Sequence, residues 1–99
     1  MRVISRRTIK EFWEKKQFAN AEEPLRAWYA EARSAAWTSW LDIRDKYSNA
    51  SILKGGRVVF NILGNKYRLV TKVEYRLGLI FIKFIGTHRE YDRIDANTT

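Results

Sequence analysis

The chain has 99 residues, of which 45% are hydrophobic and 14% aromatic, which suffices for one compact domain but not for two. It contains no cysteine, and this excludes disulfides, thiolate metal ligands and a thiol nucleophile. Nineteen Lys and Arg against eleven Asp and Glu give a formal net charge of +8, so nucleic acid is the expected partner. Composition alone leaves open a basic protein without such a partner.

The sequence predicts neither a membrane span nor a signal peptide, because no apolar run is long enough and charges interrupt the first seven positions. We therefore expect one cytoplasmic domain over residues 1–99, with no membrane interaction. Residues 1–53 hold ten basic and seven acidic side chains, whereas residues 54–93 hold nine basic and three acidic ones. The second half is thus the cationic half.

The first half of the chain predicts a strand followed by helices. Residues 2–5 form a short apolar segment, and Ser5 is placed to cap a helix ending at Lys16. Asn20 and Glu23 have the spacing of a capping box, with Pro24 in the first turn of a second helix. The expected buried stripe of this helix is Leu25, Trp28, Tyr29, Ala32 and Ala36. A third, shorter helix is expected over residues 39–46.

The second half of the chain predicts an antiparallel meander. Its apolar residues change from a period of 3.6 to a period of 2 after the breaker-rich segment 48–56. Strands are expected over residues 57–63, 66–75 and 79–85, with turns at Gly64-Asn65 and Leu77-Gly78. The whole order predicts an α+β domain: an N-terminal strand, then two to three helices packed on one face of an antiparallel sheet.

The strand register predicts which residues share a face. A tight turn at Gly64-Asn65 pairs Asn61 with Arg68 and Arg57 with Lys72, and it leaves Phe60 facing the helices. In the next hairpin, we expect Lys72 to pair with Lys83. That pairing would place Ile80, Ile82 and Phe84 on the helix side.

One face of the predicted sheet is therefore cationic, carrying Arg57, Lys66, Arg68, Lys72 and Lys83, and Glu74 is the only acid among the strand residues. Cations directly opposite each other in a sheet cost roughly 0.2–1 kcal/mol, a cost that a bound anion would remove. A solvated outer face, whose lysines discourage edge pairing, is the alternative. That alternative does not account for the lack of acids.

The chain's single histidine follows the last strand, in the segment Thr87–Asp92. Cleaving RNA by attack of the 2′-hydroxyl requires a base, an acid and cations around the phosphate. His88 and Tyr91 can exchange protons, and Arg68, Lys83 and Arg89 can bind phosphate. A lone histidine after a strand is also a common packing residue, and Glu90 and Asp92 could simply cap a short helix after Thr87.

A metal site is not predicted. Asp42 and Asp45 lie on a predicted helix with no histidine near them, and no other carboxylate pair stands beside a further ligand. We therefore expect chemistry that needs neither a metal nor another cofactor.

Three segments resemble the HigB-type toxins. Phe60-Asn61-Ile62, the run from Gly64 to Leu69 and Thr87–Asp92 match that family's Phe-Asn-aliphatic, Gly-Asn-x-x-Arg-aliphatic and Thr-His-x-Glu-Tyr-Asp patterns, and the last is the most specific. The resemblance covers essentially the whole chain. It implies a RelE-like fold, a messenger RNA endoribonuclease often associated with translating ribosomes, and neutralisation by a HigA-like antitoxin with a helix-turn-helix.

Carried over by position, the resemblance makes Arg68, His88 and Tyr91 candidate catalytic residues, and Lys83 joins them as a phosphate ligand. The expected RNA-binding residues are Arg57, Asn61, Asn65, Lys66, Lys72 and Arg89. The alternative function is a non-catalytic RNA-binding module, although the strand aromatics are assigned to the core rather than to base stacking. A DNA-binding role is disfavoured because no helix-turn-helix stands out.

Overall fold

The computed structural model describes residues 1–99, and its strands form one sheet in the order β1-β5-β4-β3-β2. The strands are β1 (Arg2–Ile4), β2 (Ser51–Ile52), β3 (Arg57–Ile62), β4 (Tyr67–Glu74) and β5 (Leu79–Thr87). Strands β2 to β5 pair antiparallel, whereas β1 pairs parallel with β5. The sheet is therefore mixed, and not wholly antiparallel as the sequence predicts. No hairpin connects β1 with β5, so the connection does not require the two strands to run antiparallel.

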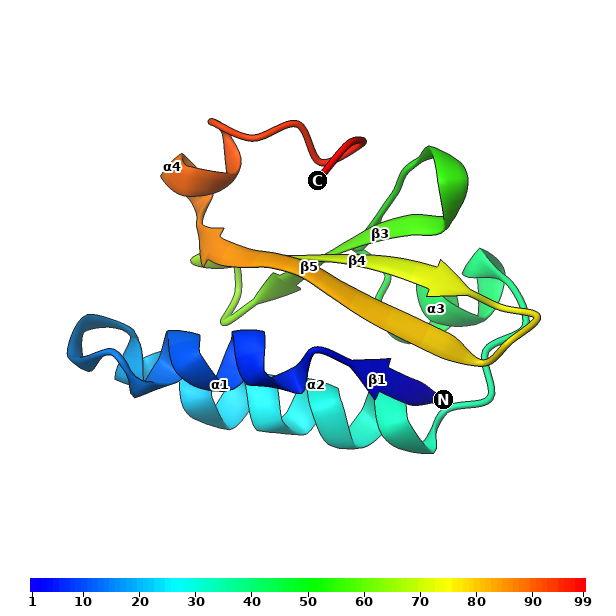
Figure 1. Cartoon of the computed structure of the whole chain (residues 1–99), viewed down its shortest axis with the longest axis horizontal. Coiled ribbons are helices and arrows are strands. Elements are labelled where there is room, and N and C mark those ends of the chain that lie inside the picture. The colour runs from blue at the N-terminus through cyan, green and yellow to red at the C-terminus, as the bar shows by residue number, and fades with distance from the viewer.

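The helices divide between the two faces of this sheet (Figure 1). Helices α1 (Arg6–Glu14) and α2 (Glu22–Ser34) lie side by side below it, joined by the 3₁₀ segment η1 (Lys16–Ala21). A third helix, α3 (Trp40–Lys46), follows α2, and a short 3₁₀ segment, η2 (Lys54–Gly56), precedes β3. Helix α4 (His88–Tyr91) and the C-terminal residues lie above the sheet. The predicted α+β class is confirmed.

The main core lies between the sheet and α1, α2 and α3, and it contains 18 buried residues. Leu25, Trp28 and Ala32 of α2 are buried as expected, whereas Ala36 lies beyond the end of the helix and is exposed. Phe60 is 0% exposed, and its ring lies 5.4 Å from that of Trp28 and 5.1 Å from that of Tyr47, centroid to centroid. Aromatic packing therefore fixes the helices on β3.

The two predicted N-terminal caps are wrong. Ser5 precedes α1 in a left-handed conformation, with φ 71°, and its side chain caps nothing. Helix α2 begins at Glu22 without a side-chain cap, because Asn20 Oδ1 instead accepts a 2.6 Å hydrogen bond from the Tyr67 hydroxyl. A long-range contact with β4 has replaced the local one that the spacing predicted. At α3, by contrast, Ser39 Oγ accepts from the Leu41 N–H at 3.3 Å.

The β3–β4 hairpin has the predicted register. Asn61 pairs with Arg68 and Arg57 with Lys72. The turn closes with the Lys66 N–H donating to the Leu63 carbonyl at 3.2 Å, and Leu63 and Gly64 adopt φ values of 55° and 65°. Glycine suits this position because it enters the left-handed region without steric cost.

The predicted register of the β4–β5 hairpin is wrong. Lys72 pairs with Phe81 rather than with Lys83, and a bulge shifts the register between Val70 and Thr71. The bulge leaves Lys83 as an extra residue between Ile82, opposite Thr71, and Phe84, opposite Val70. As a result Ile80 and Ile82 face the helices as expected, but Phe84 lies on the opposite face.

A second apolar cluster, which the sequence did not predict, lies on that opposite face. Buried Val59 and Val70 of the sheet pack with buried Ala96, and four half-buried side chains surround them: Leu53, Phe84, Tyr91 and Ile94. Residues 91–96 therefore fold back over the middle of the sheet. This second cluster anchors α4 above the sheet.

Candidate functional site

The candidate site lies at the end of the sheet where β4 begins and β5 ends. Arg68 of β4 pairs with Asn61 of β3 on one side and with Gly86 of β5 on the other. The next pair along, Tyr67 with Thr87, closes the strand, and His88 follows at the first position of α4. The topology thus brings Arg68 and His88, twenty positions apart in the chain, to one corner of the sheet.

Helix α4 begins at this corner because its sequence caps itself. Thr87 Oγ1 accepts from the Glu90 N–H at 3.1 Å, and Glu90 Oε1 accepts from the Thr87 N–H at 2.8 Å. These two bonds form a capping box. Gly86 makes this close turn possible, since a Cβ there would lie 2.6 Å from the Phe84 ring and 3.0 Å from Glu90 Oε1.

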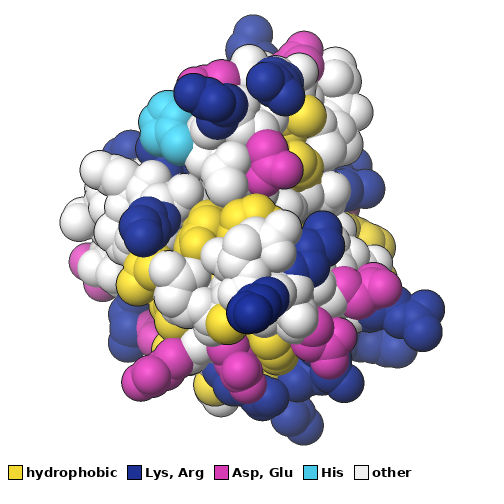
Figure 2. All heavy atoms as spheres, turned by 90° about the vertical axis from the view of Figure 1, so that its left-hand side faces the viewer, with side chains coloured by type: hydrophobic (Ala, Val, Ile, Leu, Met, Phe, Trp, Pro, Cys, Tyr) yellow, Lys and Arg dark blue, Asp and Glu magenta, His cyan; other side chains and the backbone are white.

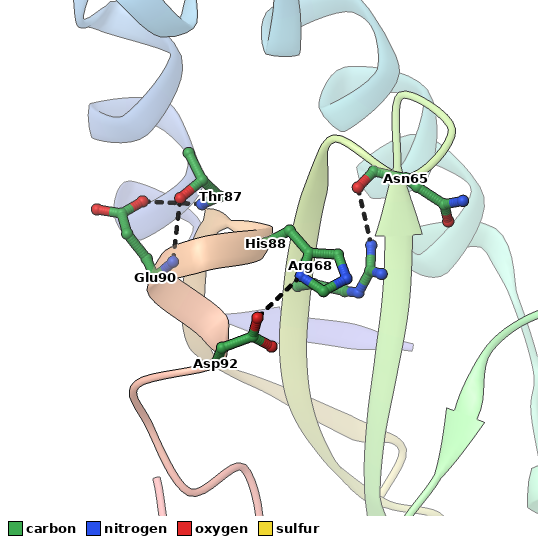
Figure 3. A network of polar contacts seen from close by, with 6 residues as sticks. All are labelled: Asn65, Arg68, Thr87, His88, Glu90 and Asp92. Atoms are coloured by element: carbon green, nitrogen blue, oxygen red, sulfur yellow. Dashed lines mark hydrogen bonds and ion pairs between the residues drawn. The ribbon is translucent and has the colours of Figure 1, made fainter.

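His88 is held on one side by the acid that directly follows its helix (Figure 3). Its Nδ1 lies 3.3 Å from Asp92 Oδ2, one helical turn further on, and its side chain is 55% exposed. The contact leaves Nε2 free. If the Nδ1 atom carries the proton shared with Asp92, then Nε2 is the unprotonated nitrogen that can accept a proton.

Arg68 is oriented by the neighbouring turn (Figure 3). Its Nη1 donates to the Asn65 carbonyl at 3.1 Å, and no acidic side chain pairs with it. The guanidinium therefore keeps Nη2 and Nε available for an anion. Asn65 acts here through its backbone, whereas the Asn61 amide, on the other side, donates to the Asn49 carbonyl at 3.2 Å.

Both kinds of charge occur on this end of the molecule (Figure 2). The imidazole lies at the upper left beside Lys and Arg side chains, with acidic side chains among them, and a second mixture of basic and acidic side chains lies lower down. An apolar strip runs between the two groups. The upper group therefore places cations next to the imidazole, where they can attract a polyanion.

Two of the predicted RNA-binding cations are already engaged elsewhere on the sheet. Arg57 Nη2 donates to the Thr99 carbonyl at 2.7 Å, beneath the C-terminal residues. Lys72 Nζ lies 3.4 Å from Glu74 Oε1. Both residues share the face of Arg68, as the register predicted, but they lie at the other end of β3 and β4 and do not join the corner.

Of the other predicted cations, two lie near the corner and one lies further along β5. Lys66 lies exposed in the β3–β4 turn, and Arg89 is exposed on α4. Lys83, in the bulge, is three residues from Gly86 along β5, roughly 10 Å at the rise of an extended strand. Its Nζ lies 5.7 Å from the centre of the Phe81 ring. Lys83 is thus outside the group formed by Arg68 and His88.

Tyr91 has a packing role in addition to its predicted chemical one. Its half-buried ring packs against the cluster of Val59, Val70 and Ala96. Because the ring anchors α4 to the sheet, a change at Tyr91 alters the position of His88 as well as removing a hydroxyl.

Comparison with known proteins identifies the family. Residues 21–94 match the HigB_toxin family, described as the RelE-like toxic component of a toxin-antitoxin system. The chain belongs to the HigB toxin family. A search of curated proteins finds no match to the chain. The matched segment contains α2, α3, the β2–β5 sheet and α4, and so includes every candidate residue of this HigB-family site.

The sequence prediction of this HigB-family site omitted two features. Asp92 was considered only as a cap, yet it lies against His88, and the i, i+4 spacing within a short helix could have indicated the pair. Phe84 was assigned to the core because the bulge at Lys83 gave no sequence signal. The alternative role considered for Glu90, capping a short helix after Thr87, is the one that the structure shows.

The structure contains neither a metal-binding cluster nor a membrane-spanning helix. No three His, Cys, Asp or Glu side chains lie close enough together to hold a metal ion. None of the helices combines the length and apolarity needed to cross a membrane.

Proposed function

We propose that this HigB-family toxin is an endoribonuclease that cleaves messenger RNA at the corner formed by Arg68 and His88. The observation that carries the proposal is the pairing of Arg68 with Gly86, two residues before His88, which puts a guanidinium without an acidic partner beside an exposed imidazole. Family membership supports the toxin role. The geometry supports the chemistry that follows.

The proposed reaction needs no metal. The 2′-hydroxyl oxygen attacks the adjacent phosphorus as its proton passes to a base, and the P–O5′ bond breaks as the leaving 5′-oxygen gains a proton. The products are a 2′,3′-cyclic phosphate and a 5′-hydroxyl. Arg68 binds the phosphate oxygens, whose charge increases in the transition state, and His88 Nε2 accepts or returns a proton. Tyr91 is the second candidate for proton transfer, and Lys83 supplies charge further along β5.

The RNA on either side of the cleaved phosphate has further cations to contact. Lys66 and Arg89 flank the corner, with Asn61 and Asn65 on the strand and turn beside Arg68. Arg57 and Lys72 would extend the RNA contact along the sheet, away from the corner. RNA could reach them only where the C-terminal residues leave the sheet uncovered. We propose the translating ribosome as the place of cleavage, a HigA-like helix-turn-helix antitoxin as the inhibitor, and the cytoplasm as the location.

A non-catalytic RNA-binding module is the second candidate, and one observation favours it. The argument against this module was that the strand aromatics are buried in the core. Phe84 instead lies half-buried on the same face as Arg68, so that argument does not apply to it. Such a module would bind RNA through the same cations without cutting it.

The first prediction tests the proposed site. Arg68→Ala should reduce RNA cleavage at least a hundredfold, because one phosphate-stabilising contact in a transition state is worth about 10²–10³ in rate. The free energy of unfolding should change by less than about 1 kcal/mol, since Arg68 is half-exposed and makes only one side-chain hydrogen bond. Cleavage of a defined RNA by gel, with urea unfolding, measures both.

The matched control is Arg76→Ala, an exposed arginine in the turn at the far end of β4. A substrate with a single 2′-deoxy substitution at the cleaved position should resist the unchanged protein. An active Arg68→Ala variant would refute the assignment of the corner. RNA that binds tightly but is never cut would instead establish the binding module.

A further inference from the structure

A hollow of about 290 Å³ opens between α2 and the end of β3. Strand β2 pairs only with Val58 and Val59, so the rest of β3 has a free edge on this side. Pro24 and Ala27 of α2 and Leu63 of the β3–β4 turn supply apolar wall, and Asn61 lines the same hollow. Because Asn61 of β3 pairs with Arg68 of β4, the hollow lies one strand away from Arg68.

One buried polar atom at this hollow has no hydrogen-bond partner. Trp28 is 2% exposed and lines the hollow, and its indole N–H has no acceptor. Glu31 Oε1 is buried too, but it has a partner, because it lies 3.0 Å from Lys46 Nζ in an ion pair. A buried donor left unpaired is destabilising, so the unpaired indole N–H at this cavity points to a ligand that accepts a hydrogen bond.

A third polar group lines the same cavity. Burial, and after it the negative charge of Glu31, raises the pKa of Tyr47 to about 12. The phenol is therefore protonated at neutral pH and can donate a hydrogen bond. The hollow combines two donors, the indole and the phenol, with one carboxylate acceptor and apolar walls.

We propose that this hollow binds a guanine base of the RNA, next to the phosphate held by Arg68. Guanine presents two adjacent donors, N1–H and the N2 amino group, for the Glu31 carboxylate. Its O6 and N7 are acceptors for the Trp28 and Tyr47 donors. Adenine and cytosine each offer a single amino donor on the corresponding edge, and uracil offers one ring N–H. The inference rests on the proposed function in one respect only, namely that the guanine belongs to the RNA that the protein cleaves.

Binding of single nucleotides tests the hollow without any cleavage. Guanosine 5′-monophosphate is titrated into the ¹⁵N-labelled protein, and the indole N–H signal of Trp28 is followed by NMR beside those of the other three tryptophans. We expect the Trp28 signal to move with the guanine nucleotide. The adenosine, cytidine and uridine monophosphates should bind about tenfold more weakly, the difference that a bidentate contact provides.

Glu31→Gln should weaken the guanine nucleotide about tenfold and the other three by less, since each of those bases offers Glu31 only one donor. Glu23→Gln, an exposed carboxylate of the same helix, is the matched control and should bind as the unchanged protein does. The inference is overturned if the Trp28 signal stays still at saturating nucleotide, if all four nucleotides bind equally, or if Glu31→Gln keeps the guanine preference. None of these results depends on whether Arg68→Ala still cleaves RNA.

Discussion

On one face of the sheet 18 buried residues form a core between the strands and three helices, whereas on the other face only Val59, Val70 and Ala96 are buried, where residues 91–96 lie over the sheet. The first layer is built from large aromatic and aliphatic side chains. The second is a thin cover that leaves the polar ends of the strands open. Arg68 and Asn61 lie beside this cover, half-exposed on the same face.

The difference between the two faces separates stability from chemistry. The helical face supplies most of the apolar burial and so most of the folding free energy. The thin face can therefore hold charged side chains whose hydrogen-bonding capacity is not used in folding. Residues 91–96 need only fix α4, and with it His88, over the end of β5.

The largest expected effect tests the helical face. Phe60→Ala should lower the free energy of unfolding by about 3–5 kcal/mol, the typical cost of truncating a fully buried phenylalanine. Phe60 is 0% exposed and contacts the rings of Trp28, Trp37 and Tyr47, so the cavity would have little chance to collapse. Urea unfolding followed by circular dichroism measures the loss.

The matched variant on the thin face is Phe84→Ala. Phe84 is half-buried, and its truncation should cost about 1–2 kcal/mol. Equal losses for the two variants would contradict the division of stability between the faces.

An intermediate effect is expected at α4. Thr87→Ala removes the side-chain half of the capping box, and loss of an N-cap typically costs about 1 kcal/mol. The loss should be local, because α4 has only four residues and is held by the second cluster. Hydrogen exchange should accelerate at the Glu90 amide and stay unchanged in β3. Thr87→Ser, which keeps the hydroxyl, is the control, and faster exchange in that variant too would argue against the cap.

The sequence predicted the parts of the fold that depend on local pattern. Alternation and the Gly64-Asn65 turn fixed the pairing of Asn61 with Arg68, because a two-residue turn allows little freedom of register. The β4–β5 pairing failed at Lys83, since a bulge is a single inserted residue with no composition of its own. Asn20 failed as a cap because a hydroxyl from β4 competed for its side chain.

The sequence also predicted only part of the candidate site. The corner of Arg68 and His88 follows from one hairpin register and from the position of His88 after the last strand. The hollow beside Trp28 and Glu31 could not be predicted, because it depends on how α2 packs against the free edge of β3. The second cluster was missed because Ala96 lies between Asp95 and Asn97, in a stretch that reads as polar.

The smallest expected effect is a pH dependence of the free energy of unfolding that arises from Tyr47, on the helical face of the sheet. Tyr47 has an ordinary pKa of 10.0 that rises to about 12 in the folded protein, through burial and then through the charge of Glu31. A raised pKa in an acid means that the folded state favours the neutral phenol. This contribution to stability is complete below pH 10, and it is lost as the pH rises from 10 to 12. The loss should be modest, because Tyr47 is only half-buried and water screens its charge.

Tyr47→Phe removes the titrating group, so its free energy of unfolding should fall less steeply between pH 9 and about pH 11 than that of the unchanged protein. Lysines titrate in the same range in both proteins, as does Tyr75, whose pKa is raised by burial and by Asp42. The difference between the two slopes therefore isolates Tyr47. Parallel slopes in urea unfolding across this range would show that the phenol is solvated in the folded state, and would remove it from the set of donors facing the hollow.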